Sequence, residues 1–208
     1  MDPLAGVSAT KVVAEAKANA EAAPSLTMDG TITQQGQSDL IDLGIKRGQG
    51  CAGSIGLSGQ GTVKLILIGK TIYMNPDKQF WTTNAGANAK AVIALVNGRY
   101  LKVPASDKNM AGIAVLCDVG KLLNQDAATT TYTKGAVTTL DGRRVLAIKV
   151  SDGSTDYVTD TSKPEYVEAT APKGAKSGSG KVIISVGAPV TLTAPPASDV
   201  IDGTALGV

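Results

Sequence analysis

The sequence predicts one α+β domain built around an antiparallel sheet. Residues 8–23 have apolar side chains at helical spacing, and from residue 25 onward apolar and polar residues alternate in short runs. Helical spacing returns between residues 87 and 125, and alternation resumes beyond residue 130. Turns that contain glycine separate the alternating runs, which is typical of an antiparallel meander. The order of helix, strands, helices and strands therefore favours a single α+β domain.

The first helix is expected over residues 8–23. Ser8 is a good N-cap, and Pro24 ends the helical pattern. The apolar positions on one side of this helix are Val12, Val13, Ala16, Ala20 and Ala23. An amphipathic helix of this kind is expected to cover one face of a sheet.

The alternating runs predict strands of five to eleven residues. Those before the second helical region are 25–35, 39–48, 54–58, 61–69 and 70–76, and a short strand follows at 100–105. Those in the second half are 130–140, 143–151, 156–161, 164–172, 181–187 and 189–196. Between the two sets, helices are expected at 87–98, ended by Asn97-Gly98, and at 108–125.

Composition argues against several functions. The chain has no histidine, which removes the commonest general base and the usual zinc ligand. The net charge of +2 and the aromatic content of 3% do not fit a nucleic-acid-binding surface. The aspartates are scattered in turn-like contexts, and their spacing singles out no acid–base pair. The sequence therefore predicts no catalytic residue, no metal site and no cofactor.

The run RGQGCAGSIGLSGQG, residues 47–61, contains a glycine motif and one of the two cysteines. Gly48, Gly50 and Gly53 have the G-x-G-x-x-G spacing of a dinucleotide-binding loop. That loop must lead into a helix, whereas the residues after Gly53 alternate like a strand, so cofactor binding is rejected. Cys51 and Cys117 are too far apart for a C-x-x-C motif, which leaves two buried thiols or one disulfide. The disulfide is favoured if the chain is exported.

Several segments, taken in order, resemble the LppX/LprG type of actinobacterial cell-envelope lipoprotein, which is related in fold to the lipoprotein carrier LolA. The segments are DPLAGVSATKVVAEAKANAEAAPSLTMDGTI, GQGCAGSIGLSGQGTVKLILIGKTIYMNPDKQFW, YLKVPASDK, LCD at 116–118, YVTDTSKPEYVEA and APVTLTAPPASDVID. The second is the most specific of them. Together they cover nearly the whole chain.

The resemblance implies a strongly curved antiparallel sheet, a half-barrel of about ten strands, with helices on its concave face. It implies a single lipid-binding domain over residues 1–208, in which residues 1–7 are the remnant of a tether. An apolar cavity between sheet and helices would bind acylated lipids or glycolipids. Its expected walls are Leu65, Leu67, Ile72 and Met74 on strands and Val92, Ile93, Val96 and Leu116 on helices. A Cys51–Cys117 disulfide would join the sheet to the helices.

The resemblance further implies a non-enzymatic, extracytoplasmic protein. An acyl anchor would attach it to the membrane through a lipobox cysteine, which is not among residues 1–208. The expected partners are therefore a lipid and a membrane, with a membrane protein as a further partner and no nucleic acid. The alternative is an interaction module that modulates a membrane sensor, with its interior filled by side chains and no ligand.

Overall fold

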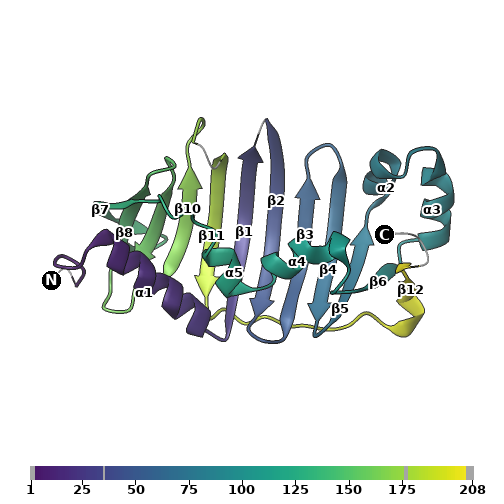
Figure 1. Ribbon diagram of the computed structural model, residues 1–208, viewed down its shortest axis with the longest axis horizontal. Coiled ribbons are helices and arrows are strands. Elements are labelled where there is room, and N and C mark those ends of the chain that lie inside the picture. Colours follow the sequence, from purple (N-terminus) through teal and green to yellow (C-terminus); the bar gives the residue numbers. More distant parts are fainter. Residues whose placement is uncertain (1–2, 35, 176–177, 205–208) are drawn as a thin grey trace.

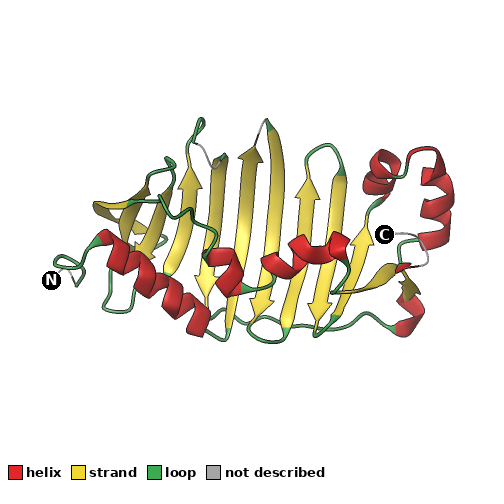
Figure 2. Cartoon of the chain, in the orientation of Figure 1, coloured by secondary structure: helices red, strands yellow, loops and turns green. Residues whose placement is uncertain are grey.

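The computed structural model describes residues 3–34, 36–175 and 178–204. It contains one large, strongly curved sheet with helices packed on one side of it (Figures 1 and 2). The strands are β1 Ser25–Gln34, β2 Gln37–Lys46, β3 Gly50–Leu57, β4 Gly61–Ile68, β5 Thr71–Pro76, β6 Tyr100–Pro104, β7 Tyr132–Leu140, β8 Arg143–Val150, β9 Thr155–Thr159, β10 Tyr166–Ala171, β11 Ser179–Val186 and β12 Val200–Asp202. The helices are α1 Ala9–Ala22, α2 Lys78–Asn84, α3 Ala89–Val96, α4 Ala111–Leu116 and α5 Val119–Leu123. Short 3-10 turns lie at Gly86–Asn88, Lys108–Met110 and Ala197–Asp199.

The sheet is unclosed and mostly antiparallel. Its strand order is β12-β6-β5-β4-β3-β2-β1-β11-β10-β9-β8-β7, so β12 and β7 are the two edges. The predicted α+β class, the curved half-barrel and its meander are confirmed. Within the described part of the chain the sheet has twelve strands where about ten were expected, and the last pair, β6 with β12, is parallel.

Helix α1 closely matches the predicted helix 8–23. The Ser8 hydroxyl oxygen accepts a hydrogen bond from the Lys11 backbone N–H at 3.3 Å, which caps the first turn. Val12, Val13, Ala16 and Ala20 are buried, as their spacing predicted. The helix therefore packs its apolar face on the sheet near β7 and β10.

The middle of the chain forms shorter helices than expected. Helix α2 was not predicted, because seven residues give too little periodicity to detect. The Asp77 carboxylate caps it by accepting from the Phe80 N–H at 2.7 Å. The single helix expected at 108–125 is broken at Cys117 and Asp118, where Asp118 caps the new helix α5 by accepting from the Lys121 N–H at 3.1 Å.

The two cysteines form the expected disulfide. Cys51 lies in β3 and Cys117 follows α4, and their Cα atoms are 5.2 Å apart. The bond attaches the α4–α5 segment to the sheet face on which Cys51 is buried. Figure 2 shows α1, α5 and α4 crossing in front of one half of this concave face. Helices therefore lie on the concave side, as predicted, and cover part of it.

The glycines around Cys51 allow close approach of the neighbouring strands and lead into no helix. Gly50 has φ +141°, and a Cβ built on it would lie 1.8 Å from the Leu67 carbonyl oxygen of β4. A Cβ on Gly53 would lie 2.0 Å from the Asp42 carbonyl oxygen of β2. Only glycine allows such close approach between neighbouring strands. The segment 47–61 is thus a turn, strand β3 and a second turn into β4, as the alternation predicted.

The predicted strand 189–196 pairs with no strand in the described residues. It crosses the convex face of the sheet as an extended segment that we call the C-terminal strap, residues 188–196, before β12 joins the edge (Figure 1). Gly44 allows this crossing, because a Cβ built there would lie 3.0 Å from Cγ2 of Val190. The strap therefore brings the chain behind the sheet from β11 to β6.

The described residues before α1 pack against the domain. Leu4 is buried in the core, and the Lys134 ammonium donates to the carbonyl oxygens of Leu4 and Ala5. In the part of the chain that is described, none of the helices is both long and apolar enough to cross a bilayer.

Candidate functional site

Strand register places apolar side chains in three parallel rows on the concave face. The first row is Val186, Leu26, Ile45, Cys51, Leu67, Ile72 and Val103. The second is Ile184, Met28, Leu43, Gly53, Leu65, Met74 and Leu101. The third, which we call the outer row, is Ala169, Val182, Gly30, Ile41, Ile55, Val63 and Pro76.

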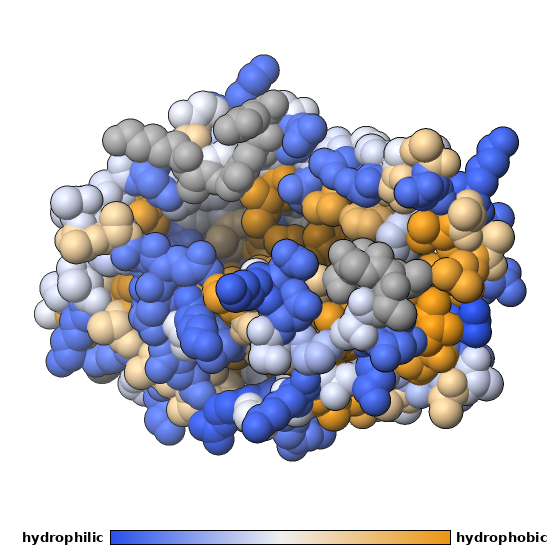
Figure 3. All heavy atoms as spheres, turned by 45° about the vertical axis from the view of Figure 1, so that its right-hand side comes forward, coloured by the Kyte–Doolittle hydropathy of each residue, from blue (hydrophilic) through white to orange (hydrophobic). Residues whose placement is uncertain are grey.

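Burial decreases from the first row to the outer row. Nearly all members of the first two rows are buried, because α1, α4 and α5 cross the half of the sheet that carries them. Val182, Ile41 and Ile55 of the outer row are only partly buried, although they pack against the same core. Figure 3 shows hydrophobic atoms in a hollow of this face with hydrophilic side chains around it. The outer row is thus an apolar strip continuous with the core, in which Val63 and Pro76 are buried, and we call its partly buried portion from Ala169 to Ile55 the groove.

A pocket of about 190 Å³ lies at the β9–β10–β11 end of this groove. Ile32, Ala169 and Val182 give it apolar walls, and Asp156 of β9 is the carboxylate among its lining residues. Asp156 faces this side because it pairs in register with Ala169 on β10 and with Ile148 on β8. The pocket therefore combines apolar walls with one carboxylate, and Lys181 of β11 also lines it.

The surroundings of Asp156 disfavour its charged form. Burial, together with the smaller effects of the Asp126 and Asp152 carboxylates, raises its pKa to about 6, and the Lys17 ammonium opposes this rise. Lys17 pairs with Asp126, which also accepts a hydrogen bond from the Tyr132 hydroxyl at 2.8 Å. Near pH 6 the Asp156 carboxyl, at this end of the groove, is therefore half protonated.

The four strand residues predicted to line a cavity lie together on the concave face. Leu65 is directly opposite Met74, and Leu67 is directly opposite Ile72, and all four are buried. Leu67 also lines a pocket of about 370 Å³ beside the disulfide, together with Ile45 and Cys117. Leu116, at the end of α4, is partly buried against the core next to that disulfide.

The three predicted residues of α3 lie elsewhere, at the β5–β6 end of the sheet. Val96 is buried, and Val92 and Ile93 are partly buried against the core. Ile93 and Val96 line a pocket of about 300 Å³ with Trp81 of α2. The Trp81 ring is buried edge-to-face against Phe80, with ring centroids 5.4 Å apart.

The sequence reasoning did not select the outer row as a candidate site. Ile41 and Ile55 belong to recognised alternating runs, so the pattern showed which side chains share a face. It did not show that the helices cover only part of that face. Asp156 was grouped with the turn aspartates, and no signal in the sequence separates it from them.

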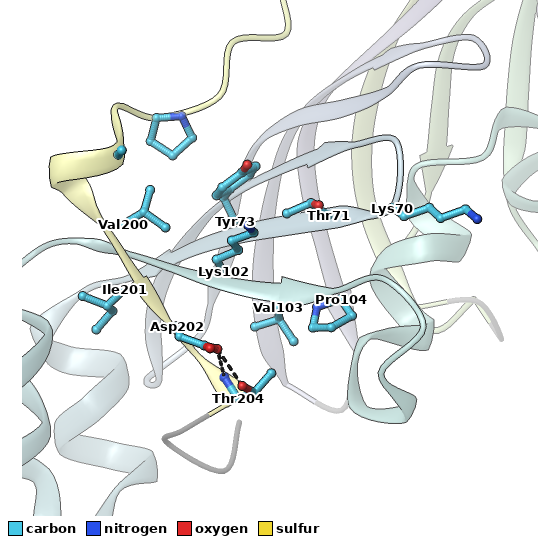
Figure 4. A pocket seen from close by; sticks show the side chains of 12 residues that line it. Lys70, Thr71, Tyr73, Lys102, Val103, Pro104, Val200, Ile201, Asp202 and Thr204 are labelled. Atoms are coloured by element: carbon cyan, nitrogen blue, oxygen red, sulfur yellow. Dashed lines mark hydrogen bonds between the residues drawn. The ribbon is translucent and has the colours of Figure 1, made fainter.

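A further pocket, of about 680 Å³, lies on the convex side between the C-terminal strap and strands β5 and β6. Figure 4 shows Thr71, Tyr73 and Lys102 of the sheet among the lining residues, with Val200 across the pocket, and the Thr204 N–H and hydroxyl donate hydrogen bonds to the Asp202 carboxylate. Two hydrogen bonds from Thr204 lower the pKa of the Asp202 carboxyl. Nothing in the sequence reasoning placed a pocket here, because it depends on the path of the strap.

Comparison with known proteins identifies the fold. No protein-family model matches the sequence, and no curated protein matches it. Among solved structures, LprF from Mycobacterium bovis superposes with a TM-score of 0.57 at 15% identity, covering 90% of this chain and 96% of its own. The Mycobacterium tuberculosis lipoprotein LppX superposes with a TM-score of 0.51 at 13% identity, covering 88% of this chain and 99% of its own. The chain thus has the fold of LppX/LprG-type mycobacterial lipoproteins, as its sequence suggested.

Proposed function

We propose that this protein binds acylated lipids or glycolipids in the concave groove, without chemistry of its own. The observation that carries the proposal is the outer row, an apolar strip that continues from the core and is only partly covered. Burying acyl chains there would gain about 0.8 kcal/mol per CH₂ group. Likeness in fold to a lipoprotein, LppX, supports this function over others.

The groove has suitable dimensions for an acyl chain. Neighbouring strands are about 4.8 Å apart, so the partly buried portion of the outer row, from Ala169 on β10 to Ile55 on β3, extends over about 19 Å of sheet. The acyl chains of one leaflet occupy half of a hydrocarbon core that is about 30 Å thick. The row is therefore long enough for an extended chain. The eight residues predicted from sequence would form its deeper and end walls, with Leu65 and Met74 next to Val63 and Pro76.

The same proposal includes the cellular location of the protein and its domain organisation. Residues 1–208 form one lipid-binding domain, and residues 1–7 lead to a lipid anchor in the membrane outside the cytoplasm. The Cys51–Cys117 disulfide supports an extracytoplasmic location, because such bonds persist in oxidising compartments.

Two neighbouring residues of β2 provide a matched test. Ile41 lies in the groove, whereas Leu40 is 59% exposed and points to the convex face. Ile41→Asp should weaken binding of a fluorescent long-chain fatty acid about tenfold or more, since it places a charge in the acyl path. Leu40→Asp adds the same charge on the other face and should leave binding unchanged. Equal binding by both variants and the unmodified protein would refute the groove as the lipid site.

The alternative function is an interaction module with a filled interior. The burial of the first two rows favours it, because side chains occupy most of the space under the helices. Such a protein would bind no acyl chain at any concentration. A pull-down with it would recover one membrane partner. Absence of fatty-acid binding by the unmodified protein would therefore support this alternative.

A further inference from the structure

The outward face of α3 differs from that of an ordinary solvated helix. Ala91, Ala94 and Leu95 are exposed on it, and Leu95 is 52% exposed. The opposite face, with Val92 and Val96, packs toward the core. Surface helices normally place charged and polar residues on the side away from the core. This outward face instead combines an unpartnered leucine, small alanines and one lysine, Lys90.

The segment that carries this face has charged residues of one sign. Residues 78–106 contain Lys78, Lys90, Arg99 and Lys102 and no Asp or Glu, in a chain that has 18 acidic residues. Lys78 and Lys90 are exposed. Arg99 donates to the carbonyl oxygens of Leu95 at 2.7 Å and Val96 at 3.2 Å. These bonds hold a guanidinium cation beside the exposed leucine.

The acidic residues that border this segment accept hydrogen bonds from backbone N–H groups. Asp77 accepts from the backbone N–H groups of Phe80 and Thr62, and Asp107 accepts from the Asn109 N–H. Figure 3 shows hydrophobic atoms close to hydrophilic side chains at the end of the molecule that comes forward. An exposed apolar side chain in a segment whose charged side chains are all cations is complementary to a membrane surface with anionic headgroups.

We propose that the α2–α3 end of the protein docks on the surface of a membrane that contains anionic lipids. Leu95 enters the interface between headgroups and acyl chains, and Lys78, Lys90 and Arg99 face the phosphates. This contact uses a surface separate from the outer row of the groove. It does not depend on the groove binding a lipid, so the two proposals can fail independently.

Flotation with vesicles at low salt tests the docking surface. The 208-residue chain should bind vesicles of phosphatidylglycerol and phosphatidylcholine, and should not bind vesicles of phosphatidylcholine alone. Each cation near an anionic surface contributes about a fivefold gain in binding, so Lys78→Gln with Lys90→Gln should lower it about 25-fold. Leu95→Asp should lower it about tenfold or more, because a buried leucine contributes that much.

Matched controls lie at other places on the molecule. Lys149→Gln with Lys163→Gln makes the same change in net charge at exposed sites near β8 and β9. Leu40→Asp changes a leucine that is more exposed than Leu95. Both controls should retain most of the binding. The proposal is overturned if the unmodified chain does not bind anionic vesicles, or if either α2–α3 variant loses no more binding than its control.

Discussion

Cys51 and Cys117 join the concave face of the sheet to the helical layer, with their Cα atoms 5.2 Å apart and a sequence separation of 66 residues. Through this bond, a strand from the first half of the sheet holds the α4–α5 segment over the first row of apolar residues. The coverage of the concave face therefore depends on a covalent link as well as on packing.

Removing that link should destabilise the protein. The double variant Cys51→Ala, Cys117→Ala is expected to lose about 2–4 kcal/mol of unfolding free energy, because the open loop gives the unfolded chain more entropy. Urea denaturation followed by circular dichroism measures the loss. Dithiothreitol should destabilise the unmodified protein and leave the double variant unaffected. A double variant as stable as the parent would show that packing alone holds α4 and α5 in place.

Asp156 should make stability depend on pH. Its pKa in the folded protein is about 6, above the ordinary value of 3.8, so the folded state holds the proton more tightly than the unfolded state. The favourable contribution is present below pH 4 and is lost as the pH rises through about 6. Asp156→Asn should therefore stabilise the protein at pH 7, by at most about 3 kcal/mol, and should have little effect at pH 3.5.

Unfolding in urea at several pH values checks this prediction. Glu165→Gln, at an exposed position, is the control and should change stability little at either pH. A stabilisation by Asp156→Asn that is the same at pH 3.5 and pH 7 would contradict an ionised carboxylate as its cause.

The crossing of the C-terminal strap should be sensitive to side-chain size at Gly44. Gly44→Leu places new atoms where Val190 lies, so we expect a loss of about 1–3 kcal/mol and faster proteolysis within 188–196. Shortening the opposing side chain with Val190→Ala in the same chain should restore part of the stability. If Gly44→Leu is equally destabilising with and without Val190→Ala, the two residues are not in contact.

Local patterns predicted the elements of this fold well. Ser8 and Pro24 marked the limits of α1, and the alternation in 39–48 and 61–69 identified which side chains of β2 and β4 share a face. The glycines of 47–61 were correctly assigned to a strand and its turns, because Ile55 and Leu57 continue an alternating pattern where a cofactor loop needs a helix.

The features that define the groove depend on long-range packing. Nothing in the residues of β2 indicates that Ile45 lies under the helices while Ile41 lies beyond them. That difference follows from the position of Cys117, which is 66 residues away from its partner. The strap was predicted as a strand because its residues alternate, yet Gly44 and Val190 direct it across the convex face. Asp156 is distinguished by neighbours that come from several segments, among them Ala169 of β10, Ile148 of β8 and Asp126.

The most direct test of the groove is to locate a bound acyl chain by nuclear magnetic resonance. In methyl-labelled protein mixed with a long-chain fatty acid, the chain should give nuclear Overhauser effects to the methyl groups of Ile41, Ile55 and Val182. Effects only to Ile66, Ile68 or Ile183 on the convex face, or none to either face, would contradict the account.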